Sequence, residues 1–348
     1  MPLDHYLNAI SGLDQTEEQC IKYELEKAGL FSHLSSFPLA CLQFELTSNC
    51  NANCLHCYNN SFLNKTADDM TPQKWKDFSK YLVEHGGVFE CIISGGEPLL
   101  LGNSLFEIMD ILHHDGTCFL FETNGFLLNK SIVNRLSIYR YHWLQISVDG
   151  CNPQYHDTFR QLNGCWEKAV NGIRLSVRAN IPVKIAHCVT PYNIHDIDKM
   201  CALAYSLGVS AITIGELCLS GRTNQHRELL LTEYERKLLT DKVNDNRAKY
   251  EPYMRVKRSN SICEGLKKHM KKPYSSAFIR PNGDVRIDGM APFVVGNILQ
   301  EDFCYIWEKK LAQCWEKEEV QQFINGFDKT DRNYKFINYF NKDIYFEK

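Results

Sequence analysis

The fold is decided by the stretch Cys50-Asn-Ala-Asn-Cys54-Leu-His-Cys57-Tyr58, in which three cysteines stand at the spacing C-x3-C-x2-C. The run directly before it, residues 41–46, alternates apolar and polar side chains as a β-strand does. Asparagine is frequent around the cysteines, and this residue favours turns and tolerates unusual backbone angles. We therefore expect a loop at the carboxyl end of a strand, where three thiolates converge on one small object.

Thiolate ligands suit zinc or an iron–sulfur cluster. Structural zinc takes four protein ligands, and His56 is badly placed as the fourth because it directly precedes Cys57. A four-iron cluster normally takes four cysteines, so with three of them one iron stays open to bind another molecule. A disulfide-bonded loop is a further alternative, and the pattern favours the cluster over both alternatives.

The triplet followed by an aromatic residue, here Tyr58, resembles the signature of the radical S-adenosylmethionine (SAM) family. The resemblance implies that the open iron of a 4Fe-4S cluster chelates the amino and carboxylate groups of SAM. An electron from the cluster then cleaves the bond between sulfur and C5′, and the resulting 5′-deoxyadenosyl radical abstracts hydrogen from a substrate. Amino-acid side chains cannot do this chemistry alone.

Composition and charge exclude several other classes of protein. The 348 residues suffice for one large domain with an appendage, and a net charge of −3 gives no global basic field for nucleic acid. No apolar run reaches the ~18 residues of a membrane span, and the first residues do not resemble a secretory signal. We expect a cytoplasmic chain with reduced thiols, because an open cluster does not survive an oxidising compartment.

Strands and helices are expected to alternate from residue 41 to about 222. The expected strands are 41–46, 88–94, 117–122, 143–148, 183–189 and 211–215, and the expected helices are 71–85, 104–115, 130–138, 165–179 and 195–207. Such alternation predicts an α/β fold with a parallel sheet, and six units are too few for a closed eight-stranded barrel. The family resemblance implies a partial (β/α)6 TIM barrel, the radical SAM core, with the cluster at the carboxyl edge of its strands.

The loop after the second expected strand reads Ser94-Gly95-Gly96-Glu97-Pro98. Glycines allow backbone to approach a ligand closely, and Glu97 can accept hydrogen bonds from a cationic amine. The resemblance implies that this loop contacts the amino group of SAM. An ordinary turn is the alternative interpretation.

Five further residues at the ends of later strands are expected to bind SAM by the same resemblance: Asn124, Ser147, Asp149, Arg160 and Arg222. The planar guanidinium of Arg160 suits a carboxylate, and Arg222 resembles the arginine that approaches the SAM carboxylate. The alternatives are a simple turn at Asp149 and a surface salt bridge between Arg160 and Asp157.

Two residues after the sixth strand, Glu216 and Cys218, are expected at the same edge and are candidate catalytic residues facing the reaction chamber. The alternative for Cys218 is a thiol buried in the core.

The C-terminal part carries a hairpin signature, Pro281-Asn-Gly283-Asp, between two alternating runs. It resembles the C-terminal extension called SPASM or twitch, an α+β domain of peptide-modifying radical SAM enzymes. That extension usually carries cysteines for auxiliary clusters, whereas here no cysteine lies between Cys263 and Cys304. Cys304 and Cys314 fall in an expected amphipathic helix, so we expect the hairpin to persist as a scaffold without an auxiliary cluster.

These observations predict four segments. They are N-terminal helices in 1–39, the radical SAM partial barrel in 40–222, a charged helical connector in 223–259 and a SPASM-like domain in 260–348 with an aromatic-rich tail. The expected cofactors are one 4Fe-4S cluster, held by Cys50, Cys54 and Cys57, and SAM. We expect no nucleic-acid or membrane partner.

By resemblance, the expected substrate is a ribosomally synthesised peptide, modified by cross-linking, epimerisation or a related C–H functionalisation. Its leader would be recognised by another surface or by a separate protein, and the electron donor would be a ferredoxin or flavodoxin. The alternatives are a radical SAM enzyme of a small-molecule or cofactor biosynthetic pathway and a non-catalytic, cluster-bearing scaffold.

Overall fold

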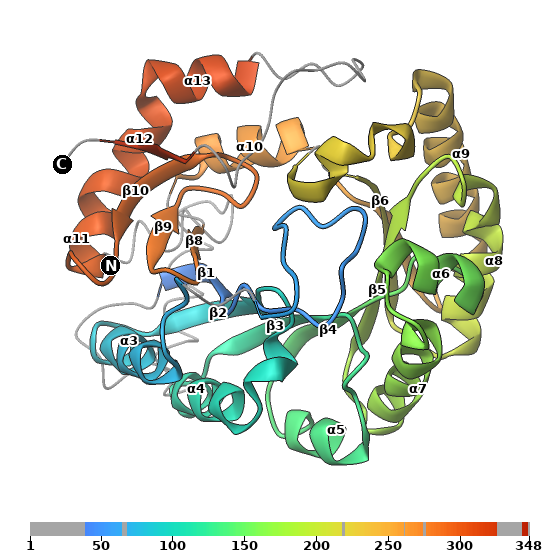
Figure 1. The fold of residues 1–348 in the computed structure, drawn as a ribbon, viewed down its shortest axis with the longest axis horizontal. Helices are drawn as coiled ribbons and strands as arrows, with labels where there is room; N and C mark the ends of the chain where they lie inside the picture. The colour runs from blue at the N-terminus through green and yellow to red at the C-terminus, as the bar shows by residue number, and fades with distance from the viewer. Residues whose placement is uncertain are drawn as a thin grey trace.

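The computed structural model of the chain describes residues 39–64, 68–217, 220–260, 262–273, 276–325 and 343–346 (Figure 1). The expected N-terminal helices lie outside these residues, apart from the last position of their segment. Among the described residues, no helix has the length and apolar character needed to span a lipid bilayer.

Six parallel strands form the centre of the fold. They are β1 (Leu39–Glu45), β2 (Val88–Ser94), β3 (Cys118–Thr123), β4 (Tyr141–Ser147), β5 (Val183–Val189) and β6 (Ala211–Glu216). Each strand pairs in parallel with the next one in the chain, from β1 to β6. The expected strand ranges are confirmed to within two residues at each end.

Helices cover the outer side of this curved sheet (Figure 1). They are α3 (Pro72–Glu84), α4 (Asn103–His114), α5 (Lys130–Leu136), α7 (Cys165–Arg178), α8 (Ile197–Ser206) and α9 (Glu233–Tyr250). Helix α6 (Pro153–Arg160) instead contacts the loop that follows β1. Short 3-10 turns are η1 (Pro98–Leu101), η2 (Ile194–Asp196), η3 (Gly221–Gln225) and η4 (Arg227–Leu229). α3 shows why such segments become helical. Thr71 caps its amino end, Pro72 occupies the first turn, and Trp75, Phe78 and Leu82 form its buried stripe.

The two faces of the sheet differ in their exposure to solvent. In β5, Val183, Ile185 and Val189 are buried, whereas Lys184 and Cys188 between them are only half-buried. Alternate side chains of a strand point to opposite faces, so the buried set faces the helices and the other set faces the inside of the curve. The concave face of the sheet is therefore open to solvent, unlike the packed interior of a closed barrel.

Two elements differ from the sequence-based expectation. Residues 153–160 form helix α6, for which Asn152 is the N-cap and Pro153 the first residue, a start signal that the sequence interpretation did not use. The connector is helical in α9, but Arg255–Arg258 forms strand β7, which pairs in parallel with β6. Val256 is buried in this strand, and its pairing with β6 overrides the charged composition.

The C-terminal region adds four short strands and a group of helices. These are α10 (Ile262–Lys271), β8 (Ala277–Ile279), β9 (Asp284–Arg286), β10 (Phe293–Asn297), α11 (Phe303–Tyr305), the π-helical segment η5 (Ile306–Leu311), α12 (Ala312–Glu316), α13 (Glu318–Asn325) and β11 (Ile344–Tyr345). β8 and β9 form the expected antiparallel hairpin. Gly283 in its turn has φ +87°, a conformation that glycine adopts without strain.

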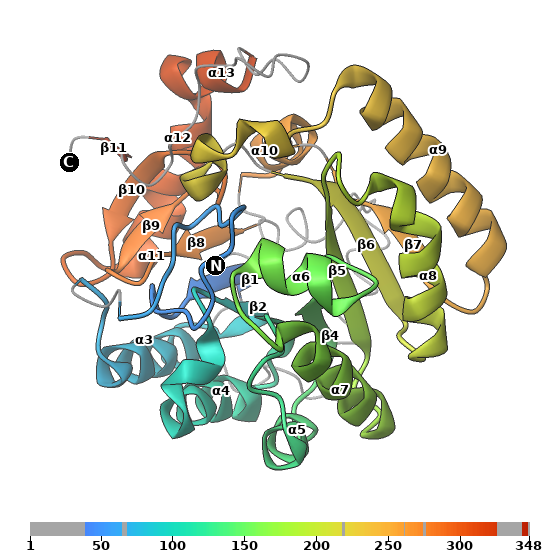
Figure 2. The same ribbon diagram turned by 45° about the vertical axis from the view of Figure 1, so that its right-hand side comes forward.

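This hairpin is part of the barrel sheet. β8 pairs in parallel with β1 on the side away from β2, so the described strands form one sheet in the order β11-β10-β9-β8-β1-β2-β3-β4-β5-β6-β7. Figure 2 shows β8, β9 and β10 continuing the sheet beside β1. The C-terminal region is thus joined by backbone hydrogen bonds to the strand that leads into the three cysteines.

Candidate functional site

The segment that carries the three cysteines, residues 46–64, is called here the cysteine loop. It leaves the carboxyl end of β1, and in Figure 1 it lies across the middle of the curved sheet. The backbone N–H of Cys50 donates to the Phe62 carbonyl at 3.1 Å, and that of Leu55 donates to the Phe159 carbonyl of α6 at 3.0 Å. The loop is therefore shaped by its own backbone and by the helix that sequence interpretation missed.

The sulfur atoms lie in a buried, donor-rich environment. Cys50 and Cys54 are buried, and backbone N–H groups donate to Cys50 Sγ from Ala52 at 3.4 Å and to Cys57 Sγ from Ser61 at 3.3 Å. Burial raises the pKa of Cys50 to about 12 and that of Cys54 to about 11. Without a bound cation these thiols are protonated, and a bound metal centre favours the thiolate form that the N–H groups stabilise.

The grouping of ligand atoms fits a cluster better than a single zinc ion. Of the residues that the structure describes, the metal-binding side chains whose ligand atoms all lie within 4.8 Å of each other are His56, Asp149 and Cys188, not the three loop cysteines. Tetrahedral zinc with bonds of about 2.3 Å requires sulfur atoms about 3.8 Å apart. His56 stacks on Phe159 with ring centroids 4.2 Å apart, and its ligand atom groups with Asp149 and Cys188, not with the three loop cysteines.

Gly95 and Gly96 bring the loop after β2 against the cysteine loop. A Cβ atom on Gly95 would lie 2.7 Å from the Thr47 carbonyl oxygen, and one on Gly96 would lie 2.2 Å from that of Asn49. The N–H of Gly96 donates to Thr47 at 2.6 Å. The observed neighbour of the two glycines is thus backbone of the cysteine loop, and their expected contact with SAM stays a prediction.

Glu97 is fully buried next to these glycines. Its carboxylate accepts hydrogen bonds from Thr123 Oγ1 at 2.8 Å, from the Asn124 N–H at 2.8 Å and from the Leu99 N–H at 3.2 Å. Burial raises the pKa of Glu97 to about 7, although these bonds lower it. Asn124 Nδ2 in turn donates to Asn51 Oδ1 at 2.7 Å, so residues from three loops form one hydrogen-bonded unit.

Asp149 and Arg160 form a buried pair on the other side of the cysteine loop. Arg160 donates to one carboxylate oxygen through Nε at 2.8 Å and Nη2 at 2.7 Å, and the Cys188 N–H donates to the other at 2.9 Å. Burial alone would raise the pKa of Asp149, but Arg160 holds it well below its usual range. The Arg160 charge also favours the thiolate of Cys54.

The two alternatives weighed for this pair are wrong. Asp157 does not pair with Arg160, because its carboxylate accepts hydrogen bonds from the N–H groups of Gly164 and Trp166 at the start of α7. Asp149 is more than a turn residue, since its carboxylate holds a buried guanidinium. Ser147, also expected to bind SAM, is half-buried on the concave face at the end of β4.

Arg222 supports the cysteine loop from η3. Its Nε donates to the Cys54 carbonyl at 2.7 Å, its Nη1 to Asn60 Oδ1 at 3.1 Å and its Nη2 to the Ser61 carbonyl at 2.7 Å. All three guanidinium nitrogens thus bond to the loop that presents the cysteines. Gly221, which precedes it, has φ +55° and packs against the Cys57 carbonyl.

Of the two candidate catalytic residues, Cys218 lies outside the described residues. Glu216 ends β6 and accepts from Arg236 Nε at 2.6 Å and from Arg258 Nη2 at 2.8 Å, one to each carboxylate oxygen. In the structure it therefore ties α9 and β7 to β6, and its catalytic role stays a prediction.

Polar side chains line the concave face near the cysteine loop. Gln145 on β4 donates to Glu122 on β3 at 2.9 Å, and Lys184 occupies the paired position on β5. Burial raises the pKa of Glu122, against the opposing charge of Lys184. Their half-exposed side chains give the interior of the curve a polar surface of both charges.

Sequence interpretation missed a buried chain of polar contacts behind the third cysteine. Tyr58 donates to Glu45 Oε1 at 2.9 Å, and Arg280 of the hairpin turn pairs with Glu45 Oε2 at 3.0 Å. Glu45 is 1% exposed, which requires such partners. A glutamate at the end of the strand that leads into the cysteine loop was the available signal.

Comparisons with known proteins agree with this geometry. The model of the radical SAM superfamily matches residues 44–204. An AdoMet-dependent heme synthase of Methanosarcina barkeri is 30% identical over 304 residues, 82% of this chain and 86% of that protein. The subtilosin biosynthesis protein AlbA of Bacillus subtilis is 29% identical, covering 79% of this chain and 61% of its own length.

Among solved structures, SuiB of Streptococcus suis bound to S-adenosylmethionine has a TM-score of 0.64 and 15% identity, covering 87% of this chain and 73% of that one. At this identity the likeness concerns the fold alone. The heme synthase, in contrast, is related along most of both chains, and the family model covers β1 to α8. The chain therefore belongs to the radical SAM superfamily and is an enzyme that uses a 4Fe-4S cluster and SAM.

Proposed function

We propose that this enzyme modifies a ribosomally synthesised peptide by C–H functionalisation such as cross-linking or epimerisation. The bound cluster and SAM supply the one-electron chemistry that makes an unactivated C–H bond reactive. The chain's own residues hold these groups, position the substrate and keep water away from the reacting atoms.

The observation that carries the proposal is the open concave face beneath the cysteine loop. Polar and charged side chains from three strands, Glu122, Gln145 and Lys184, are partly exposed there. A peptide presents both donors and acceptors along its backbone, and a polar surface of both charges can bind it. The relatives support the same class of substrate, since AlbA is a bacteriocin biosynthesis protein and SuiB has been solved with its precursor peptide SuiA.

In this proposal Cys50, Cys54 and Cys57 hold the cluster. Gly95, Gly96, Glu97, Asn124, Ser147, Asp149, Arg160 and Arg222 form the surroundings of SAM, some by contact and others by holding the cysteine loop. Arg222 belongs to the second group, because its guanidinium bonds to the loop, whereas Arg160 holds the carboxylate of Asp149.

The domain division proposed from the sequence keeps residues 40–222 as the radical SAM core and 260–348 as a SPASM-like region. The electron donor in this proposal is a ferredoxin or flavodoxin, and the cytoplasm is the compartment. The described cysteines support a reducing compartment, because none of them forms a disulfide.

A second candidate function is a step in tetrapyrrole or other cofactor biosynthesis. One observation favours it: the heme synthase of Methanosarcina barkeri matches this chain over a larger share of its own length than AlbA does. A tetrapyrrole carries several carboxylates on an apolar frame, and Lys184 on the concave face offers a cation for one of them.

A single assay separates the two functions. The reconstituted enzyme is supplied with SAM and dithionite, and 5′-deoxyadenosine is measured with candidate precursor peptides and, separately, with iron-containing porphyrins that carry propionates. Peptide modification supports the proposal; cross-linking is seen as a change in peptide mass, and epimerisation is seen as deuterium incorporation when the assay is run in D2O. Modification of the porphyrin and not of any peptide encoded beside the gene would replace the proposal with the second candidate.

A further inference from the structure

The helix that runs through α11, η5 and α12 contains a π-helical segment, Ile306–Leu311. Such segments are rare in proteins, and those that occur often lie at functional sites. One side of this helix packs Trp307 and Trp315 into the core. The opposite side carries a pocket that has no role in the radical SAM site.

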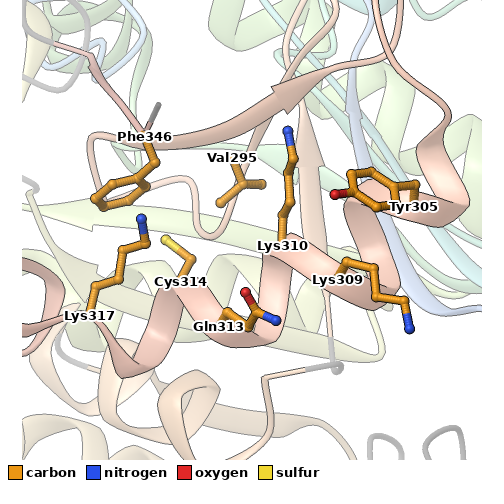
Figure 3. A pocket seen from close by; sticks show the side chains of 8 residues that line it. All are labelled: Val295, Tyr305, Lys309, Lys310, Gln313, Cys314, Lys317 and Phe346. Atoms are coloured by element: carbon orange, nitrogen blue, oxygen red, sulfur yellow. The ribbon is translucent and has the colours of Figure 1, made fainter. Parts of the chain in front are cut away.

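This pocket, called here the lysine pocket, has a volume of about 410 Å³ (Figure 3). It is lined by Val295, Tyr305, Lys309, Lys310, Gln313, Cys314, Lys317 and Phe346. Val295 and Cys314 are buried at its base, Lys310 and Lys317 extend from the helix beside it, and Lys309 lies at its outer margin. No aspartate or glutamate is among these residues, so the pocket combines an apolar base with ammonium groups.

The charges of the pocket are only partly balanced. Lys310 forms an ion pair with Glu301, and its Nζ lies 5.7 Å from the centroid of the Tyr305 ring. The Nζ of Lys317 lies 3.9 Å from the centroid of the Phe346 ring. Lys309 is exposed, and the described residues show no carboxylate paired with it or with Lys317. Of the three lysines that line the pocket, only Lys310 is paired with a carboxylate among the described residues.

This arrangement suits a carboxylate attached to an apolar group. The ammonium of Lys317 can bind a carboxylate while it stays over the ring of Phe346, and the ring and base of the pocket can pack against the apolar part. Two sources offer this chemistry: an acidic side chain beside an apolar residue of a peptide, and a propionate on a porphyrin.

The neighbouring sheet edge favours the peptide. β11, directly before Phe346, is the last strand of the described sheet, and Ile344 and Tyr345 in it are 41% and 59% exposed. An extended peptide can pair with a strand at a sheet edge and place alternate side chains in adjacent pockets. We propose that the lysine pocket binds an acidic segment of the peptide substrate and so docks the substrate on the C-terminal region. This inference rests on the proposed function.

The test measures binding of two probes to the full-length holoenzyme by fluorescence anisotropy at low ionic strength. The first probe is a short fluorescein-labelled peptide of glutamate and phenylalanine, and the second is the same peptide with lysine in place of glutamate. Protoporphyrin IX is added separately as a competitor that carries propionates. We expect the acidic peptide alone to bind.

The variant K309E/K317E removes two positive charges from the pocket and adds two negative ones. We expect it to weaken binding of the acidic peptide by about tenfold or more, equivalent to about 1.4 kcal/mol. The milder variant K309Q/K317Q is expected to weaken it less. The matched control, K267E/K268E, makes the same charge change at exposed lysines of α10 and is expected to change binding by less than about twofold.

An equal loss of peptide affinity in K309E/K317E and in the control would mean that the attraction is non-specific and would overturn the inference. Unchanged peptide binding in both pocket variants would also overturn it. Binding of the porphyrin through the same lysines, without the peptide, would overturn it in favour of the second candidate function. The release of 5′-deoxyadenosine without peptide should be equal in all variants. If the enzyme binds the acidic peptide through these lysines but modifies no peptide, the proposed function is rejected, while the lysine pocket is retained as a peptide-binding site.

Discussion

Single residues in the cysteine loop and its neighbours decide whether the three thiolates converge. Backbone carbonyl groups of the cysteine loop occupy the space where a side chain at Gly95 or Gly96 would stand. Three residues donate hydrogen bonds to the carboxylate of Glu97. At this scale the sequence drew attention to these positions, but it did not indicate which groups surround them. The glycines were expected beside a ligand, and the structure places them against another loop of the protein.

Replacement of Gly96 by alanine tests this close approach. The new Cβ would lie 2.2 Å from the Asn49 carbonyl oxygen, so the cysteine loop must move, and we expect a loss of about 2 kcal/mol of stability. Iron retention should fall with it, because Asn49 directly precedes Cys50. Thermal unfolding and iron analysis measure both effects. Gly265→Ala in α10 is the control, since nothing lies within 4 Å of its added Cβ; an equal loss there would contradict the explanation.

Glu97 should make the stability of the cluster-free protein depend on pH. Its pKa rises from 4.5 to about 7 through burial, so between these values the folded protein holds a proton that the unfolded chain has lost. Its contribution to stability is present below pH 4.5 and is lost as the pH rises to about 7. The effect is on the order of 3 kcal/mol, since one unit of pKa corresponds to about 1.4 kcal/mol.

The variant Glu97→Gln removes this titration. We expect lower stability at acid pH, because the amide meets the Asn124 N–H as a second donor, and a flatter dependence on pH than in the parent. Chemical denaturation of the cluster-free protein at several pH values measures the difference. Glu84→Gln, on the exposed end of α3, should leave the profile unchanged. Parallel profiles of parent and Glu97→Gln would refute the assignment.

At the scale of elements, the β8–β9 hairpin is part of the catalytic sheet. β8 pairs with β1, and Arg280 in the hairpin turn reaches Glu45 at the end of β1. The strand before the cysteines is thereby fixed from both sides, by β2 and by β8. The hairpin turn was predictable from Pro-Asn-Gly, but its partner strand was not, because pairing between distant segments leaves no local pattern.

The substitution Ile279→Asp in β8 tests this connection. Ile279 is fully buried and lies opposite Phe44 of β1 in the sheet. A carboxylate at this position therefore costs several kcal/mol of stability. We expect reduced cluster content as well as reduced stability, since β1 carries the cysteine loop. Gln321→Asp, exposed on α13, provides the control. A variant of Ile279 that is less stable yet binds iron normally would show that the hairpin does not support the cluster.

At the scale of the whole molecule, the fold places Cys50, Cys54 and Cys57, called here the cysteine tripod, at the carboxyl edge of the curved sheet. Outside the tripod, Cys304 and Cys314 lie on one continuous helix, ten residues apart, which corresponds to about 15 Å. They cannot bind one cluster together. Among the described residues of the C-terminal region, no group of three metal-binding side chains gathers. The expectation of a scaffold without an auxiliary cluster stays a prediction.

Counting iron in the anaerobically reconstituted enzyme tests this expectation. One cubane cluster gives about four irons per chain, and an auxiliary cluster would bring the count to about eight. The triple variant C50A/C54A/C57A should hold essentially no iron. A triple variant that retains about four irons would reveal a second site in this chain.

The sequence by itself determined the cysteine tripod, the succession of strands and helices to α8 apart from α6, and the turn of the C-terminal hairpin. These features are local, since they depend on spacing, alternation and turn-forming residues. Only the tertiary structure decided that Arg160 pairs with Asp149, that Arg222 holds the cysteine loop, that 255–258 adds a strand and that the hairpin extends the barrel sheet. A buried charge or a sheet edge takes its partner from whatever the fold brings near, and that partner can lie anywhere in the chain.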